Sequence, residues 1–182
     1  MHKIILINLA IVILFLSANL IFHKALKVGL KVPREDDMKL TTVFKHNEKI
    51  PSVYTCDGED LAPELTISDV PAETKELVLI VDDPDAPMGT WVHWLVYNMP
   101  ATTTKIDAKN LPTGAKEGMT DFGKRGWGGP CPPSGTHRYF FKLYALDKTL
   151  DLQTGLTKAQ LERAIKNHVI EKDELIGLYK RN

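Results

Sequence analysis

Apolar runs along the chain fall into two classes that differ in length. The first run, IILINLAIVILFLSANLIF at 4–22, is nineteen residues long and carries no charge. The other runs have the length of strands and are bounded by Pro, Gly and Asp. ELVLIVDD (76–83) is continuously apolar up to its two aspartates, which is typical of a strand covered on both faces. TWVHWLVYNM (90–99) and HRYFFKLYAL (137–146) are rich in aromatic and β-branched residues, which favours two further strands.

Short runs separated by prolines predict a mainly β protein. We expect a weaker strand in KIPSVYTCDG (49–58), where it runs into a turn, and a last strand in ELIGLYKR (174–181). Several runs lie too close together for helices between them. An antiparallel β-sandwich is therefore favoured over alternating strands and helices.

One segment, LTKAQLERAIKNHV, has the pattern of a helix. Thr157 and Gln160 have the spacing of a capping box, in which each side chain bonds the backbone N–H of the other residue. An apolar stripe follows at Leu161, Ala164, Ile165 and Val169. We expect this helix to cover an apolar part of the sandwich.

The apolar segment at 4–22 is long enough to cross a bilayer as a helix. Because it is apolar all round and terminal, a membrane anchor or signal peptide is favoured over a buried core helix. The lack of a clear small-x-small cleavage site favours a retained anchor. We therefore divide the chain into an anchor or signal peptide (1–23), a linker (24–37) and one domain (38–182). A membrane-anchored or secreted protein is expected, with the domain on the periplasmic or another extracytoplasmic side.

Charge is distributed unevenly along the chain, although its formal net charge is zero. The first 36 residues carry five Lys or Arg and two acidic residues, and four of these basic residues follow the apolar segment. By the positive-inside rule that excess favours a cytoplasmic domain instead, so the topology stays open. The rest of the chain carries 18 basic and 21 acidic residues, which gives it no electrostatic footprint for nucleic acid.

The chain has two cysteines, Cys56 and Cys131. They are too few for a disulfide scaffold, and they lack the CxxC spacing of a zinc or redox site. In an oxidising compartment the two could form a disulfide, and in a reducing one they would stay free.

The loop after the 76–83 strand concentrates carboxylates. Asp83 and Asp85 alternate with Pro84 and Pro87, which remove backbone donors and stiffen the loop. Taken alone, this pattern suits a turn whose carboxylates cap backbone amides. In the strand that follows, the period-two rule places one set of residues on a shared face: Trp91, His93, Leu95, Tyr97 and Met99. A lone histidine on such a face is more often a packed core residue than a ligand contact.

The stretch GWGGPCPPSGTHRY (126–139) has the same design. Its glycines allow close backbone approach, and its prolines stiffen the chain before His137 and Tyr139, which share a strand face. If both strands lie in one sheet, carboxylates, imidazoles, a phenol and backbone amides would line one small pocket. Such a pocket suits a phosphate ester or a small zwitterion, because imidazole and amide N–H groups can hold phosphate oxygens.

Two motifs in this order, DPDAPMGTWVHWLVYNMP (83–100) and GWGGPCPPSGTHRYFFKLYALD (126–147), resemble the phosphatidylethanolamine-binding protein family, which includes the Raf kinase inhibitor proteins. YTCDGEDLAPEL (54–65) and HVIEKDELIGLYKR (168–181) are similar to its prokaryotic branch, and the resemblance covers about 38–182. It implies an antiparallel Greek-key β-sandwich with a few peripheral helices and an anion pocket for phosphate-like or phospholipid head groups. Carried over position by position, it implies a set of pocket residues: Asp83, Asp85, Pro87, His93, Gly129, Pro130, His137 and Tyr139.

We therefore expect a non-enzymatic binding protein without a cofactor or metal. Its expected partners are a small phosphate-containing or zwitterionic ligand, a protein kinase or protease that it could inhibit, and a membrane through the N-terminal segment. The alternative is an enzyme, since His and Asp in one pocket could form a hydrolase or a His/carboxylate metal site. Against it, the chain has no GxSxG, HExxH, Walker A or GxGxxG motif, and the loop around Ser134 implies no triad. A membrane-tethered scaffold with an unused pocket is a third reading.

Overall fold

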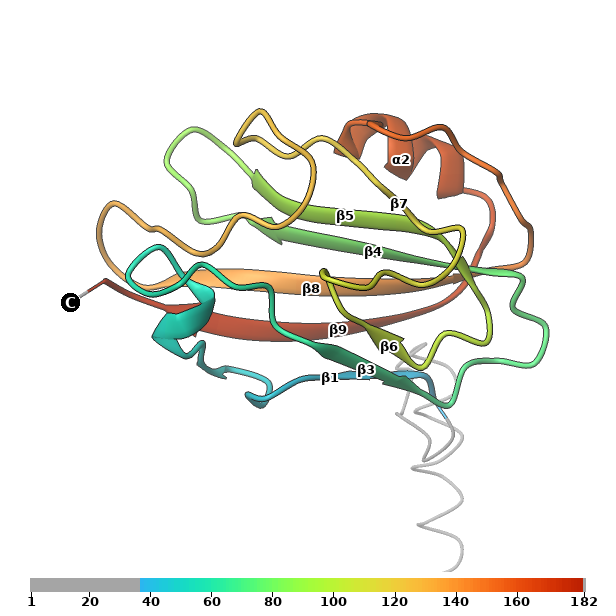
Figure 1. Cartoon of the computed structure of the whole chain (residues 1–182), viewed down its shortest axis with the longest axis horizontal. Coiled ribbons are helices and arrows are strands. Elements are labelled where there is room, and N and C mark those ends of the chain that lie inside the picture. Colours follow the sequence, from blue (N-terminus) through green and yellow to red (C-terminus); the bar gives the residue numbers. More distant parts are fainter. Residues whose placement is uncertain (1–36, 182) are drawn as a thin grey trace, which may run out of the picture. The chain divides into compact units, whose positions relative to one another are not determined.

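The runs predicted as strands form the centre of a six-stranded sheet in the computed structural model, which describes residues 37–181 (Figure 1). This sheet has the order β2 (Glu48–Lys49), β9 (Val169–Tyr179), β8 (His137–Leu146), β4 (Glu76–Asp83), β5 (Trp91–Pro100), β7 (Lys116–Glu117). A smaller sheet has the order β1 (Lys39–Thr41), β3 (Leu65–Ser68), β6 (Lys105–Ile106). The predicted mainly β fold with few helices is confirmed, whereas the Greek-key order of a sandwich stays a prediction.

Strand β4 lies between β5 and β8, antiparallel to both, and every one of its residues is buried. Its side chains alternate between two apolar clusters, because successive residues of a strand point to opposite faces. Leu77 and Leu79 pack in the larger cluster, which also contains residues of the smaller sheet. Val78 and Ile80 pack in the second cluster, on the face covered by helix α2 (Lys158–Ile165). The apolar run of β4 thus reflects burial on both sides, as predicted.

The predicted shared face of Trp91, His93, Leu95, Tyr97 and Met99 is wrong for Leu95 and Tyr97. The β4–β5 pairing shifts between Val81 opposite Trp94 and Asp82 opposite Val92, so His93 is an extra residue in a β-bulge. Beyond the bulge, alternation restarts in the other phase. Leu95 and Tyr97 pack in the α2-side cluster, and a second shift returns Met99 to the larger one. A one-residue slip reverses the face of each residue that follows.

The predicted helix is present but shorter than its apolar stripe. Thr157 caps it, and Gln160 completes the capping box by accepting from the Thr157 backbone N–H at 2.9 Å. Leu161 and Ile165 are buried against the sheet. Val169, predicted on the helical stripe, instead begins β9 and is 37% exposed. Strand β9 therefore starts before the predicted residue 174.

The strand predicted at 49–58 is wrong for most of that range. Only Glu48–Lys49 pair with β9, in parallel, and the chain then forms a 3₁₀ turn, η1 (Ser52–Tyr54). Pro51 stands between the two elements. Because proline has no N–H to donate to a ladder, the strand ends there.

Consecutive aspartates at the end of β4 point to opposite faces. Asp82 is fully buried on the α2 side, where it accepts from Lys142 of β8 at 2.7 and 2.8 Å and pairs with Lys158 of α2 at 2.8 Å. Two ammonium groups and short contacts compensate the cost of burying this carboxylate. Asp83 belongs to the other face, at the rim of the larger cluster.

The predicted anchor or signal peptide at 1–23, with its helix, and all but the last residue of the predicted linker at 24–37 lie outside the described residues. The described residues belong to one compact unit. Between residues 37 and 181, no helix has the length and apolar character needed to cross a bilayer.

Candidate functional site

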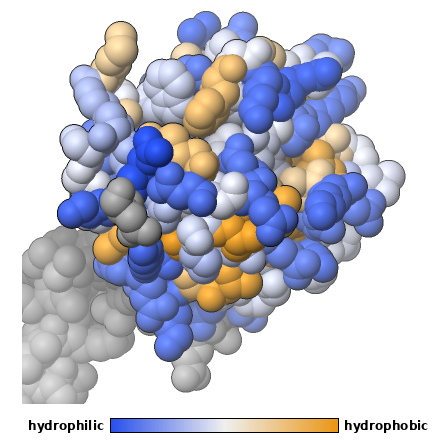
Figure 2. Space-filling view, turned by 60° about the vertical axis from the view of Figure 1, so that its left-hand side comes forward, coloured by the Kyte–Doolittle hydropathy of each residue, from blue (hydrophilic) through white to orange (hydrophobic). Residues whose placement is uncertain are grey.

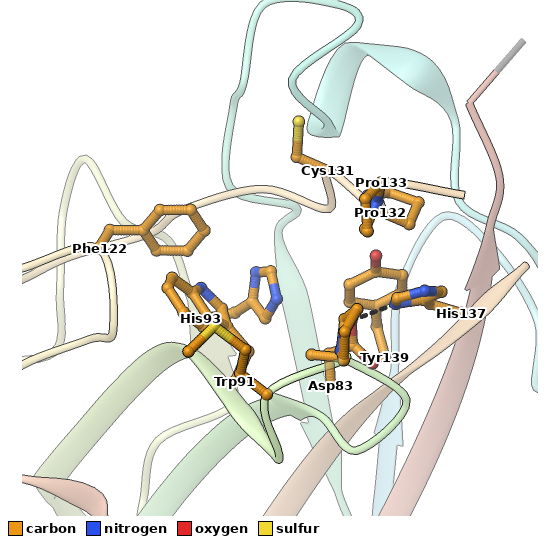
Figure 3. A pocket seen from close by; sticks show the side chains of 12 residues that line it. Asp83, Trp91, His93, Phe122, Cys131, Pro132, Pro133, His137 and Tyr139 are labelled. Atoms are coloured by element: carbon orange, nitrogen blue, oxygen red, sulfur yellow. Dashed lines mark hydrogen bonds and ion pairs between the residues drawn. The ribbon is translucent and has the colours of Figure 1, made fainter. Parts of the chain in front are cut away.

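A cavity of about 340 Å³ opens where β4 ends and β8 begins. Figure 2 turns this end of the domain forward, where apolar side chains lie among hydrophilic ones. Four polar side chains line the cavity (Figure 3): Asp83 of β4, His93 of β5, and His137 and Tyr139 of β8. The rest of the lining is Cys131 and apolar side chains: Ala86, Pro87, Met88, Trp91, Phe122, Pro132 and Pro133. The two Pro/Gly stretches thus meet at one cavity with polar groups and an apolar rim.

Asp83 and His137 form a buried pair in this cavity. The Nδ1 atom of His137 lies 2.7 Å from Oδ2 of Asp83 (Figure 3). Oδ1 of Asp83 accepts from the backbone N–H of Asp85 at 2.8 Å. Because an ionised carboxylate can only accept, the imidazole donates through Nδ1. Its Nε2 atom is left for a ligand, and it becomes a second donor when the ring is protonated.

His93 is held by a loop on the other side of the cavity. Its Nδ1 atom donates to the carbonyl of Gly128 at 2.5 Å, and the N–H of Gly128 donates back to the carbonyl of His93 at 3.1 Å. Burial lowers the pKa of His93 below its ordinary value, against the opposing effects of the Gly128 carbonyl and nearby carboxylates. The ring is therefore neutral near pH 7, and its Nε2 atom is a hydrogen-bond acceptor.

Tyr139 contributes a hydroxyl that has no hydrogen-bond partner among residues 37–181, although it is buried. Burial first, and then the negative charge of Asp83, raise the pKa of this phenol. The hydroxyl stays protonated and can donate. A buried hydroxyl without a partner is costly, so a ligand oxygen at this position would satisfy it.

Asp85 does not line the cavity, unlike Pro87 of the same loop. Its carboxylate grips Arg138 in a bidentate pair, with Oδ1 2.7 Å from Nη2 and Oδ2 2.9 Å from Nε, and it also accepts from the Arg138 backbone N–H. The hydrogen bonds from the Arg138 side chain lower the pKa of Asp85 to about 2. The residue therefore fixes the loop to the start of β8.

Gly129 and Pro130 lie outside the lining of the cavity. With Cys131 they form three consecutive ties to the loop around residues 56–60. The N–H of Gly129 donates to Asp60 at 2.7 Å, the carbonyl of Pro130 accepts from the Cys56 N–H at 3.1 Å, and Cys56 and Cys131 form a disulfide with Cα atoms 5.4 Å apart. A Cβ on Gly129 would lie 2.6 Å from the backbone oxygen of Tyr54, the last residue of η1, so only glycine fits.

Sequence reasoning missed most of the apolar rim. Phe122 packs edge-on against Trp91 and His93, with ring centroids 5.6 and 5.3 Å apart. It lies in a turn closed by the hydrogen bond from the Gly123 N–H to the Thr120 carbonyl, and no apolar run around it could have singled it out. Met88 is 93% exposed, between the predicted Pro87 and a glycine, so the Pro/Gly loop itself was the available signal.

The side chains of the site bear on whether it could hold a metal ion or supply a nucleophile. Residues 37–181 contain no group of three or more His, Cys, Asp or Glu side chains that could hold a metal ion. Among the residues that line this cavity there is no serine or threonine, and the one cysteine is in the disulfide. Ser134 is exposed and outside the lining.

Comparison with known proteins places these motifs in one family. Residues 40–180 match the family model described as phosphatidylethanolamine-binding protein. A UPF0098 protein of Methanothermobacter thermautotrophicus is 49% identical over 146 residues, which are 78% of this chain and 97% of the relative. A UPF0098 protein of Pyrococcus horikoshii is 47% identical over 152 residues, which are 79% of this chain and 77% of the relative.

Two solved structures are similar in fold and sequence. The phosphatidylethanolamine-binding protein homologue CT736 from Chlamydia trachomatis superimposes with a TM-score of 0.77 at 40% identity, covering 81% of this chain and 100% of the other. YbcL from E. coli, described as a member of the mammalian PEBP family, gives a TM-score of 0.74 at 32% identity, covering 80% and 99%. The chain therefore belongs to the phosphatidylethanolamine-binding protein family.

Proposed function

We propose that this protein is a non-enzymatic binding protein whose cavity accepts the phosphate of a small ester or of a phospholipid head group. The observation that carries the proposal is the buried Tyr139 hydroxyl, which lines the same cavity as two imidazoles whose Nδ1 atoms are already engaged. Each of the three side chains has its orientation fixed by the fold and one polar atom left for a ligand. The membership of the chain in the phosphatidylethanolamine-binding protein family supports the same proposal.

The polar groups are complementary to a phosphate monoester. Tyr139 donates to one oxygen, protonated His137 donates to a second, and the Nε2 atom of neutral His93 accepts from a P–OH group. Asp83 compensates the charge of protonated His137, so the ligand meets little net positive charge. A zwitterion, whose own ammonium offsets its phosphate, suits this balance better than a free dianion.

The apolar rim suits the part of the ligand that follows the head group. Met88, Trp91 and Phe122 surround the mouth of the cavity. An ester with an apolar substituent would bury that substituent here, since burial of apolar surface contributes about 25 cal/mol per Å². Binding without turnover is proposed because no serine, threonine or free thiol lines the cavity as a nucleophile.

Placement outside the cytoplasm, with a protein kinase or protease as the regulated partner, is part of the same proposal. The Cys56–Cys131 disulfide supports an oxidising compartment, where such bonds form and persist. A partner protein would contact the bound ligand and the rim of the cavity together.

Calorimetry with phosphoethanolamine and inorganic phosphate between pH 5.5 and 8 tests the proposal. We expect binding heat with phosphoethanolamine, because Tyr139 and His137 offer donors to its phosphate oxygens. His137→Ala should remove the heat, whereas His168→Ala, which changes a partly exposed histidine paired with Asp147, should leave it intact. A folded protein that gives no heat with either compound would contradict the proposal. Release of inorganic phosphate from phosphoethanolamine would favour the hydrolase instead.

A further inference from the structure

A second concave site lies at the end of β9, close to the cavity described above. It has a volume of about 430 Å³ and is lined by Lys49 of β2, Thr136 and the segment Leu178–Arg181. The β2–β9 pairing sets Lys49 opposite Leu178, which fixes the lysine beside the end of β9. We call this site the basic groove.

Charge in the basic groove is only partly balanced. The Nε atom of Arg181 lies 3.0 Å from Oδ1 of Asp57, and the hydroxyl of Tyr179 donates to Oδ2 of the same carboxylate at 2.9 Å. Both oxygens of Asp57 are therefore engaged. Lys49 contacts the Tyr179 ring, 5.9 Å from its centroid, and neither Lys49 nor Lys180 forms an ion pair within residues 37–181.

This positive excess contrasts with the rest of the domain. From residue 37 on, the chain carries 18 basic and 21 acidic residues, so the positive excess of the groove is local. Two ammonium groups and the exposed Thr136 hydroxyl offer +2 charge and several donors. That set matches a phosphate monoester dianion, for which lysine is a common ligand.

The groove adjoins the first cavity through the β8–β9 pair. Thr136 directly precedes His137, and His137 pairs in register with Tyr179. Neighbouring strands are about 5 Å apart, so the two sites are separated by roughly one or two strand spacings. Lys49 alternates with Ile50, which packs on the cavity side of the sheet, so a ligand that reaches both sites passes around the end of β9.

We propose that the basic groove holds a second phosphoryl group of the ligand whose first phosphate occupies the cavity of Asp83, His93, His137 and Tyr139. The proposal rests on the function proposed above and narrows its ligand to a bisphosphorylated compound. Attraction by two exposed ammonium groups contributes modestly, so the gain over a monophosphate is roughly 3- to 10-fold in affinity.

Titration calorimetry with α,ω-alkane bisphosphates of two to six methylenes, and with the matching alkyl monophosphates, tests the proposal on the purified protein. At least one bisphosphate should bind more tightly than its monophosphate by the factor given above. Lys49→Ala combined with Lys180→Ala should abolish this gain and leave monophosphate affinity unchanged. The control pair, Lys109→Ala with Lys148→Ala, removes two exposed lysines outside the lining of both sites and should retain the gain.

The outcomes separate the two proposals. Monophosphate binding without any bisphosphate gain, or an equal loss in the control pair, would overturn the basic groove and leave the proposed function standing. Absence of all monophosphate binding would contradict the proposed function. In that case NMR with inorganic phosphate decides on the groove alone: amide shifts of Thr136 and Lys180 that vanish in the Lys49→Ala/Lys180→Ala variant support it, and unshifted amides overturn it.

Discussion

The imidazole of His137 donates to the carboxylate of Asp83 across 2.7 Å, in a setting where the two residues are only 7% and 3% exposed. A charge-assisted hydrogen bond of this kind is stronger than a neutral one, and burial removes the water that would weaken it. The carboxylate also accepts from the Asp85 backbone, so its position is fixed from two sides. His137 is thereby presented to the cavity in one orientation and in one tautomer.

Asp83→Asn should weaken phosphoethanolamine binding about 10-fold or more at pH 6. The amide retains an acceptor for the Asp85 N–H but cannot balance a protonated His137, and hydrogen bonds to charged groups contribute about 1.5–3 kcal/mol. Titration calorimetry measures the loss. Asp147→Asn is the matched control, because it changes an exposed Asp–His pair with a distance of 3.0 Å. Equal affinity for Asp83→Asn and the unchanged protein would show that the pair has no role in binding.

Tyr139→Phe should separate binding from stability. Its hydroxyl has no partner among the described residues, so its removal should leave the free energy of unfolding unchanged or raise it by up to about 1 kcal/mol. Phosphoethanolamine affinity should fall about 5- to 10-fold, as one donor is lost. Tyr179→Phe should lower the free energy of unfolding and leave phosphoethanolamine affinity unchanged, because that hydroxyl donates to Asp57. Denaturant unfolding and calorimetry together check both variants, and a destabilised Tyr139→Phe with full affinity would assign the hydroxyl a structural role.

His93 should make the protein less stable in mild acid. Because burial lowers its pKa below the ordinary 6.5, the unfolded chain binds a proton below that pH while the folded chain does not. The contribution of His93 is therefore complete above pH 6.5 and declines as the pH falls towards 5. His93→Asn, which can still donate to Gly128, should lose part of this decline in urea unfolding between pH 5 and 7.5. An unchanged pH profile relative to the original protein would contradict this assignment.

Asp85 should contribute to the free energy of unfolding in a way that is lost only in strong acid. Its pKa is about 2 in the folded protein and 3.8 ordinarily, so its contribution is present above about pH 4 and is lost as the pH falls to about 2. Since Arg138 is half exposed, solvent screening limits the effect to about 1 kcal/mol. Asp85→Asn should show this deficit at pH 7 in urea unfolding and converge with the original protein near pH 2. Its affinity for phosphoethanolamine should change little, in contrast to Asp83→Asn.

The disulfide should contribute about 4 kcal/mol to the free energy of unfolding. Cys56 and Cys131 are 75 residues apart, and a cross-link over so long a loop restricts the unfolded chain strongly. Denaturant unfolding with and without dithiothreitol measures the contribution, and Cys56→Ser with Cys131→Ser should match the reduced protein. A midpoint that does not respond to reductant would mean that the purified protein lacks the bond.

The strands that sequence predicted well are those whose pattern reflects burial directly. The apolar run of β4 and the aromatic run of β8 agree with their observed bounds, and the capping box at Thr157 is present. The β5 face was mispredicted because a bulge at His93 depends on pairing with β4, which no local pattern encodes. Strand 49–58 failed for a simpler reason, since Pro51 interrupts the ladder.

The candidate site was predictable in its polar part and less so in its surroundings. Histidine, aspartate and tyrosine at Pro/Gly loops marked Asp83, His93, His137 and Tyr139, all of which line the cavity. The same motifs implied Asp85 and Gly129 equally, although the structure engages them with Arg138 and Asp60. Motif membership does not distinguish a residue that faces the cavity from one that holds the loop, because that difference depends on tertiary contacts.

Asp82 and Asp83 have different roles on opposite faces of β4, and this separation bears on how ligand specificity in this domain can be redesigned. Asp82 secures helix α2 through two lysines on one side of β4, while Asp83 serves the cavity on the other. A library that varies positions 83, 137 and 139, but spares 82, 142 and 158, would sample new specificities on a scaffold whose helix stays docked. Neighbours in sequence can thus evolve independently here, separated by the thickness of a single strand.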